Sequence, residues 1–138
     1  MPPVLGGGLL VLHGLITMVI GVGGVTKPNA PAMALPAWFD WWPGPFGRSW
    51  LLDGLNLGSG AAIVGGLIWL VAGLLLIGAG LGFLGVAPLL GQWPLLALVG
   101  ASVGLVALAL YFHPIYAVGL LINLVLVVLV WRRLAPAG

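Results

Sequence analysis

Long runs of apolar residues make up most of the chain, and polar residues gather in the short segments between them. A helix needs about 20 apolar residues to cross the hydrocarbon core of a bilayer. Four runs are close to this length or exceed it, and the prolines in 85–94 and the pair His113-Pro114 indicate turns between the last three. The pattern predicts a single all-α domain, residues 1–138, that forms an integral-membrane up-and-down four-helix bundle. The predicted spans are residues 4–25, 60–84, 95–111 and 115–131.

The segment between the first two runs, residues 26–59, is the longest loop that the pattern predicts. Its centre reads FDWWPGPFGRSWLLDG, from Phe39 to Gly54. Tryptophan rings favour the membrane–water boundary, where one edge of the ring is in apolar surroundings and the other is hydrated. We therefore expect a Trp- and Pro-rich loop that lies at the membrane interface after the first helix.

The second half of this loop is expected to contain a short interfacial helix. Ser49 has a side chain suited to an N-cap position, and Asp53 would lie in the first turns, where the helix dipole favours a negative charge. The helix should cover about residues 50–57. It should then bend at Gly58 or Gly60 into the second span.

The composition places the chain outside the class of soluble domains, because 62% of its residues are hydrophobic and 4% are charged. No charged residue occurs between Asp53 and Arg132, and a soluble domain could not bury such a run. The net charge of +2 comes from only four basic and two acidic residues, so nucleic acid is excluded as a partner. The absence of cysteine excludes disulfides and Cys-ligated metals.

Basic residues near the ends of the spans set the expected orientation. An even number of spans places both termini on one side, which carries Arg132 and Arg133, while the long loop carries Lys27 and Arg48. Because the paired arginines directly follow a span, they favour the cytoplasmic side for the termini. We expect a multi-pass protein of the cell inner membrane.

Small residues at four-residue spacing indicate helix packing, because helices in lipid associate through close approach of their backbones. We expect these residues to pack the four helices against one another. The alternative is that part of this small-residue surface docks another subunit or a second copy of the chain. The predicted packing residues are Gly54, Gly58, Ala62, Gly66, Gly100 and Gly104.

Four polar residues fall inside the predicted spans, where polar side chains are candidates for ligand binding. Counted from the loop side at about 1.5 Å per residue, Thr17 and Asn123 lie about 12 Å deep. By the same count Ser102 lies about 14 Å deep and His13 about 18 Å deep, so all four can share a central layer. The structural alternative is that Thr17 and Ser102 bond to the carbonyl one turn back. Asn123 would then hydrogen-bond across helices to His13.

His13 is the strongest candidate among these four. A histidine at this depth could carry protons, hydrogen-bond a quinone, or serve as an axial ligand of haem or chlorophyll. The structural alternative is a neutral histidine held by a hydrogen bond. His113 lies at the predicted turn, about 18 Å from the level of His13, so the two cannot ligate one iron. No cofactor is predicted, and a quinone or a pigment are the open alternatives.

Catalytic chemistry is not indicated by the sequence. The chain has no nucleophile–base arrangement, metal-ligand spacing or phosphate-binding glycine loop. We therefore expect that it is not an enzyme and that it holds no metal. Arg48 is expected to pair with Asp40, Asp53 or both at the interface, rather than to form an acid–base site with them.

Two segments resemble those of a known family, LHGLITMVIGVGG from Leu12 to Gly24 and GGLIWLVAGLLLIGAGLGFLG from Gly65 to Gly85. Both are similar to segments of small, uncharacterised bacterial four-span membrane proteins that are DoxX-like in layout. The first helix of such relatives often reads HGxxH, whereas Thr17 stands at the second histidine position here. The resemblance implies at most an association with quinol oxidase systems in respiration, and it supplies no catalytic residue.

These observations favour a small structural or accessory subunit of a membrane protein complex, with respiratory and other energy-transducing complexes as the class considered. The alternative is a small carrier or binding protein for a lipophilic ligand, namely a quinone, a lipid or a pigment, at the central polar layer. The expected partners are the lipid bilayer and either other membrane subunits or a second copy of the chain. The predicted docking residues are Trp38, Trp41, Trp42, Arg48, Trp50 and Asp53.

Overall fold

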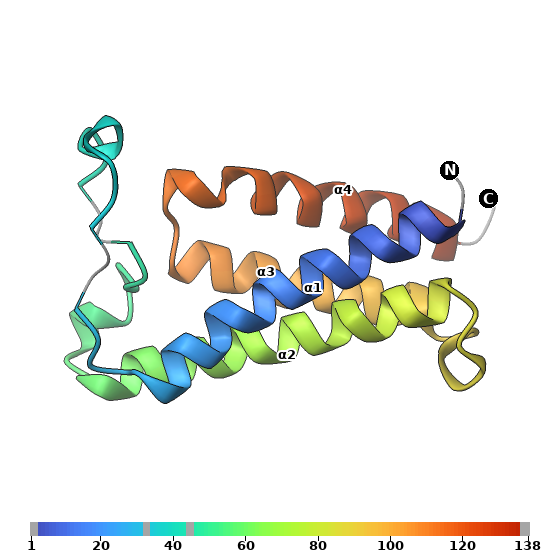
Figure 1. Ribbon diagram of the computed structural model, residues 1–138, viewed down its shortest axis with the longest axis horizontal. Helices are drawn as coiled ribbons and strands as arrows, with labels where there is room; N and C mark the ends of the chain where they lie inside the picture. Colours follow the sequence, from blue (N-terminus) through green and yellow to red (C-terminus); the bar gives the residue numbers. More distant parts are fainter. Residues whose placement is uncertain (1–2, 32–33, 44–45, 136–138) are drawn as a thin grey trace.

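The computed structural model describes residues 3–31, 34–43 and 46–135. Within these ranges the regular elements are all helical, and four helices are long and apolar enough to cross a membrane. Consecutive helices run in opposite directions, so the first begins and the fourth ends at one end of the bundle, which we call the terminal end (Figure 1). The described part of residues 27–58 lies at the opposite end, the loop end. The four helices are α1 (Pro3–Thr26), α2 (Ser59–Phe83), α3 (Trp93–Leu110) and α4 (Ala117–Leu134).

Each predicted span coincides with one of these helices, and the ends agree to within three residues. Local sequence explains two of the ends. Pro94 lies in the first turn of α3, where proline is suitable because the first N–H groups of a helix have no partner within it. Gly85 follows the end of α2 with a φ of +96°, and the N–H of Val86 bonds back to the carbonyl of Leu81 in a Schellman motif.

α1 and α2 approach each other most closely, through glycines that recur every seven residues on both helices. The carbonyl oxygen of Gly73, for example, lies 2.8 Å from the position that a Cβ on Gly14 would take. A seven-residue repeat keeps the same seam of each helix facing its partner. The two helices therefore pack backbone against backbone. The facing pairs are Gly7 with Gly80, Gly14 with Gly73 and Gly21 with Gly66.

Four of the small residues predicted to pack helices lie at helix contacts. Gly66 and Ala62 belong to the seam between α1 and α2. Gly100 faces leucine side chains of α2, and Gly104 faces Asn123 of α4. Small residues of α3 thus bring it close to both of its neighbours.

The other two predicted packing residues, Gly54 and Gly58, do not pack against a helix. Both lie in the loop before α2 begins at Ser59, and a Cβ at either position would meet no atom within 4 Å. Gly58 has a φ of +55°, which other residues rarely adopt. Its role is to turn the backbone into the start of α2, so the prediction of helix packing is wrong for these two glycines.

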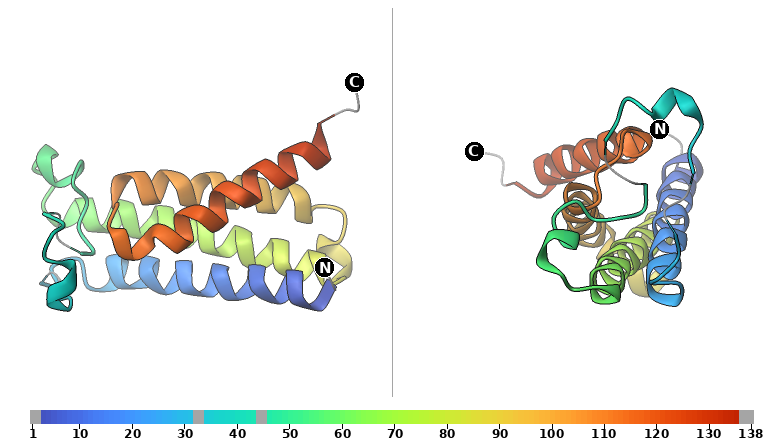
Figure 2. Two further views of the ribbon diagram at one scale, coloured as in Figure 1. Left: turned by 90° about the horizontal axis from the view of Figure 1, so that it is seen from above. Right: turned by 90° about the vertical axis from the view of Figure 1, so that its left-hand side faces the viewer.

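α4 is the helix with the least buried surface. It packs on α3 and crosses the other helices obliquely (Figure 2). Asn123 and Val130 are the two buried residues of α4, whereas α2 has ten. α2 contacts both α1 and α3, while α1 and α4 do not pack closely along their length. α2 is therefore the central helix and α4 is peripheral.

The described part of the loop between α1 and α2 contains two short 3₁₀ turns, and the short helix predicted for residues 50–57 is present only as the turn at Asp53–Leu55. Asn56 adopts a left-handed conformation directly after the second turn, and Gly58 also has a positive φ. These two residues end the helical path before α2, and the predicted bend at Gly58 is present. The 3₁₀ turns of the chain are η1 (Ala37–Phe39), η2 (Asp53–Leu55), η3 (Ala87–Leu89) and η4 (Pro114–Tyr116).

Candidate functional site

Three polar side chains of the helices meet between α1 and α4. His13 donates from its ring Nε2 to Oδ1 of Asn123, at 3.3 Å. Thr17, one turn further along α1, donates its hydroxyl to the carbonyl of His13 at 2.8 Å. Asn123 and Thr17 are buried, and His13 is partly buried. The predicted hydrogen bond between His13 and Asn123 and the predicted backbone bond of Thr17 are both present.

Ser102, the fourth polar residue of the predicted central layer, does not join this group. It is partly buried in α3 and makes no hydrogen bond with a described residue, so its predicted bond to the carbonyl one turn back is absent. α3 approaches the pair at Gly104, where an added Cβ would lie 3.0 Å from Nδ2 of Asn123. The structure thus brings together three of the four predicted ligand-binding residues.

His113 begins the turn between α3 and α4 and is only 2% exposed. Its Nδ1 accepts a hydrogen bond from the backbone N–H of Ile115 at 3.2 Å, so the side chain caps the turn η4. Because Nδ1 is the acceptor, the neutral ring carries its proton on Nε2. The turn predicted at His113-Pro114 is therefore held by the histidine side chain itself.

Aromatic rings of the loop surround the His113 ring. The ring centroids of Phe39 and Phe46 lie 5.4 and 5.5 Å from it, and that of Trp42 lies at 6.5 Å. Trp42 also packs edge-on against Phe112 at 5.2 Å. Aromatic pairs at such separations contribute about 0.5–1.5 kcal/mol each beyond the area that they bury. We call this group the aromatic cap, and its members are Phe39, Trp42, Phe46, Phe112, His113 and Tyr116.

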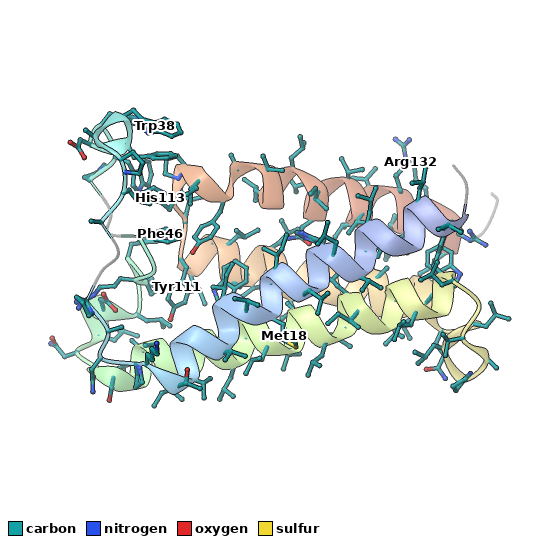
Figure 3. All side chains as sticks on the ribbon, in the orientation of Figure 1. Met18, Trp38, Phe46, Tyr111, His113 and Arg132 are labelled. Carbon is teal, nitrogen blue, oxygen red and sulfur yellow. The ribbon has the colours of Figure 1, made fainter. Side chains whose placement is uncertain are left out.

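Neighbouring aromatic residues of the loop differ in exposure, although the ring of Trp38 packs on Phe39 at 4.3 Å and that of Trp41 packs edge-on against Trp42 at 5.9 Å. Phe39 and Trp42 belong to the aromatic cap, whereas Trp38 and Trp41 are 72% and 68% exposed. Trp38 stands at the outer edge of the loop end, above His113 in Figure 3. Trp42, which was predicted to dock a partner, is turned inward, and its buried Nε1–H has no hydrogen-bond partner in the described part of the chain. Trp38 and Trp41 are therefore the two tryptophans of this part of the loop that remain candidates for docking a partner.

Ser49 and Trp50 tie the loop to the end of α3. The Ser49 hydroxyl donates to the carbonyl of Leu110 at 2.8 Å and accepts from the N–H of Leu52 at 2.9 Å. Trp50 donates from Nε1 to the carbonyl of Ala109 at 2.6 Å. The last carbonyls of an α-helix have no partner within it, so these two donors cap α3. Ser49 is 1% exposed, while Trp50 remains 62% exposed.

Tyr111 links the end of α3 to α2. Its hydroxyl donates to the carbonyl of Ala61 at 2.6 Å. The tyrosine ring occupies the space beside Gly65 that a Cβ on this glycine would need. Gly65 therefore lets the ring reach the backbone of α2.

The charged residues of the loop do not pair as predicted. Asp40, Arg48 and Asp53 are all exposed, and no ion pair forms among the charged residues that the structure describes. The predicted pairing of Arg48 with the aspartates is wrong. An exposed ion pair contributes only about 0–1 kcal/mol, so its absence costs the loop little stability.

The capping role of His113 and the bond of Ser49 to the end of α3 were not foreseen from the sequence. The His-Pro pair is a local signal that could have indicated His113 as a capping residue, because its side chain reaches only two residues ahead. For Ser49 the local N-cap pattern is real, since the hydroxyl does accept from Leu52. Its second bond reaches Leu110, 61 residues away, and no local pattern contains that partner.

The described residues contain no group of three or more His, Cys, Asp or Glu side chains that could hold a metal ion. His13 lies within α1 and His113 lies in the aromatic cap, so the two histidines belong to separate sites. Comparison with known proteins adds no relative, because no family model, no curated protein and no solved structure matches the chain. The candidate sites therefore rest on the residues of this chain alone.

Proposed function

We propose that the chain is a small accessory subunit of a membrane protein complex, inserted in the cell inner membrane with its termini toward the cytoplasm. The four helices cross the bilayer, and the loop end docks the partner on the opposite side. The proposed partners are respiratory or other energy-transducing complexes, in line with the resemblance in layout to DoxX-like proteins.

The distribution of apolar surface supports insertion in a bilayer. Large apolar side chains are exposed along the peripheral helices, including Val19 at 67%, Val118 at 69% and Leu121 at 62%. Soluble monomers rarely expose contiguous apolar surface of this kind, whereas lipid tails solvate it. The protein should remain in the membrane fraction after a wash at alkaline pH and should leave it only with detergent.

The observation that carries the docking proposal is the pair of exposed tryptophans in η1 and directly after it, Trp38 and Trp41. Trp38 and Trp41 are mostly exposed, while Phe39 and Trp42 next to them are fixed in the aromatic cap. The exposed rings therefore stand on a supported turn and lose little conformational freedom when a partner binds. Tryptophan is also enriched among the residues that dominate the energy of protein interfaces.

Co-purification from native membranes in a gentle detergent tests the docking proposal. The wild-type chain should retain a stoichiometric membrane protein, identified by mass spectrometry and by the reciprocal purification, and the double variant Trp38→Ala/Trp41→Ala should lose it. Trp131→Ala is the matched control, because Trp131 is 63% exposed but lies at the terminal end. Retention of the same partner by the double variant would contradict the proposal. A preparation that contains only copies of this chain would replace the accessory subunit by a homo-oligomer.

A second candidate function is the binding or transport of a lipophilic ligand, and the contact between His13 and Asn123 favours it. This hydrogen bond joins α1 and α4, which do not otherwise pack closely along their length. A carbonyl or hydroxyl group of a ligand such as a quinone could take the place of one partner in this bond.

An absorption spectrum and mass spectrometry of the purified protein test this second candidate. A quinone, lipid or pigment should be bound to the wild type, lost in His13→Leu, and kept in Trp38→Ala/Trp41→Ala. A wild-type protein that carries no such molecule, or a His13→Leu variant that keeps it, would exclude His13 as a ligand-binding residue.

A further inference from the structure

The terminal end of the bundle carries a cluster of arginine and tryptophan that the proposed docking at the loop end does not use. Arg132 and Arg133 lie in the last turn of α4. The guanidinium carbon of Arg133 lies 4.8 Å from the centroid of the Trp93 ring, and that ring packs edge-on against Phe83 at 4.7 Å. Arg133 is thus held over a platform that the end of α2 and the start of α3 build.

Stacking on Trp93 positions Arg133 without using its hydrogen-bond donors. A cation above an aromatic ring is attracted to the face of the ring without a hydrogen bond, so the five N–H groups of the guanidinium group stay available to a ligand. Arg132 projects away from the other helices (Figure 3). Arg132 and Arg133 are consecutive residues of a helix and point in different directions, so two cations stand at this end of α4, each with donors available to a ligand.

No acidic residue of the described chain stands at this end to oppose the two cations. Asp40 and Asp53, the only acidic residues of the sequence, both belong to the loop end, and the turn at 84–92 has none. At the loop end, by contrast, the two aspartates balance the charges of Lys27 and Arg48. The positive charge of the described chain is therefore concentrated at the terminal end.

The tryptophans beside the arginines indicate the depth of this cluster in a bilayer. Trp131 directly precedes Arg132 and is 63% exposed. Tryptophan rings prefer the level of the lipid headgroups, and arginines at a helix end extend to the same level. The phosphate groups of phospholipids lie there, and the planar guanidinium fork matches two phosphate oxygens.

We propose that Arg133, positioned by Trp93, binds the phosphate group of an anionic phospholipid, and that Arg132 strengthens the attraction through its positive charge at the same helix end. A zwitterionic headgroup would bring its own ammonium group toward two uncompensated cations, so an anionic headgroup is selected. This inference rests on the proposed insertion in a bilayer and is independent of the proposed docking at the loop end.

Native mass spectrometry of the full-length protein in detergent tests the lipid site, with phosphatidylglycerol and phosphatidylcholine added in equal amounts. Adducts with phosphatidylglycerol should predominate, and this preference should fall about fivefold for each arginine replaced, in Arg133→Gln and then in Arg132→Gln/Arg133→Gln. Arg48→Gln, the matched control at the loop end, should keep the full preference. An undiminished preference in the double variant, or an equal loss in Arg48→Gln, would overturn the proposal.

Two further measurements distinguish the lipid site from a site for free anions and from attraction by charge alone. Millimolar inorganic phosphate should leave the phosphatidylglycerol adducts in place, and their displacement would mean that the site takes free anions instead.

Arg133→Lys keeps the charge and loses the planar fork, so it should bind phosphatidylglycerol more weakly than the wild type. Equal binding would show that the positioned guanidinium is not needed. A variant that loses only the lipid preference should still be inserted in the membrane. If the proposed membrane insertion were wrong, the protein would instead leave the membrane fraction without detergent.

Discussion

The two halves of the bundle are held together by different means. α1 and α2 meet along a seam of facing glycines, where the backbone of one helix touches the backbone of the other. α3 and α4 pack through side chains rather than facing glycines, and polar contacts from other parts of the chain add to this packing. Ser49 and Trp50 cap the end of α3, and Asn123 of α4 bonds to His13 of α1.

This difference follows from the glycine content of the helices rather than from their apolar character. α1 contains seven glycines and α4 contains one, although both are apolar enough to cross a membrane. In lipid, an apolar side chain gains little by exchanging lipid tails for a neighbouring helix, so close backbone approach and hydrogen bonds decide which helices associate. A helix without small residues, such as α4, therefore remains peripheral unless polar side chains hold it.

The largest effect should come from adding one methyl group to the glycine seam. In Gly14→Ala the new Cβ would lie 2.8 Å from the backbone of Gly73, so α1 and α2 must separate, and stability should fall by about 3 kcal/mol. Gly8→Ala is the matched control on the same helix, because nothing lies within 4 Å of its Cβ position. It should be neutral or stabilising by up to about 1 kcal/mol through helix propensity. Unfolding in detergent, followed by circular dichroism, measures both variants, and equal stabilities would contradict the tight seam.

A smaller loss is expected when the polar attachment of α3 is removed. Ser49→Ala leaves the carbonyl of Leu110 and the N–H of Leu52 without their partner at a buried site, which should cost about 2 kcal/mol. Ser59→Ala is the control, since Ser59 is exposed at the start of α2 and should change stability by less than about 0.5 kcal/mol. The same unfolding measurement applies, and a Ser49→Ala variant as stable as Ser59→Ala would show that the loop does not hold α3.

The smallest effect should be the coupling between His13 and Asn123. A double-mutant cycle with His13→Leu and Asn123→Leu isolates their interaction, which should amount to about 0.6 kcal/mol, because hydrogen bonds between membrane helices are weak on average. A coupling energy indistinguishable from zero would mean that this bond does not attach α4. The attachment would then rest on α3 alone.

Much of the fold could be predicted because its signals are local. The positions of the helices follow from the apolar runs, and proline and glycine mark where helices begin and end, as Pro94 and Gly85 do. The short helix predicted for residues 50–57 is reduced to the 3₁₀ turn at Asp53–Leu55, although the Ser49 hydroxyl does accept a bond from the N–H of Leu52. Its hydroxyl also serves α3, and Asn56 leaves the helical conformation soon afterwards.

Less of the candidate sites could be predicted, because their residues act through distant partners. Trp38 and Trp42 belong to the same aromatic stretch, yet one is exposed and the other is partly buried against His113 and Phe112. The sequence shows both as candidates for an interface and gives no means of separating them. The direction in which each ring faces depends on where the turn between α3 and α4 lies.

The sequence by itself determined the number of helices, their approximate ends and their apolar surfaces, because these depend on residues that are neighbours along the chain. Only the tertiary structure decided that Gly14 faces Gly73, while Gly54 and Gly58 face no helix. It likewise decided that Arg133 stacks on Trp93 instead of projecting freely. These pairings depend on the rotation and register of each helix against its neighbour, and a uniformly apolar helix carries no amphipathic stripe that would fix them in advance.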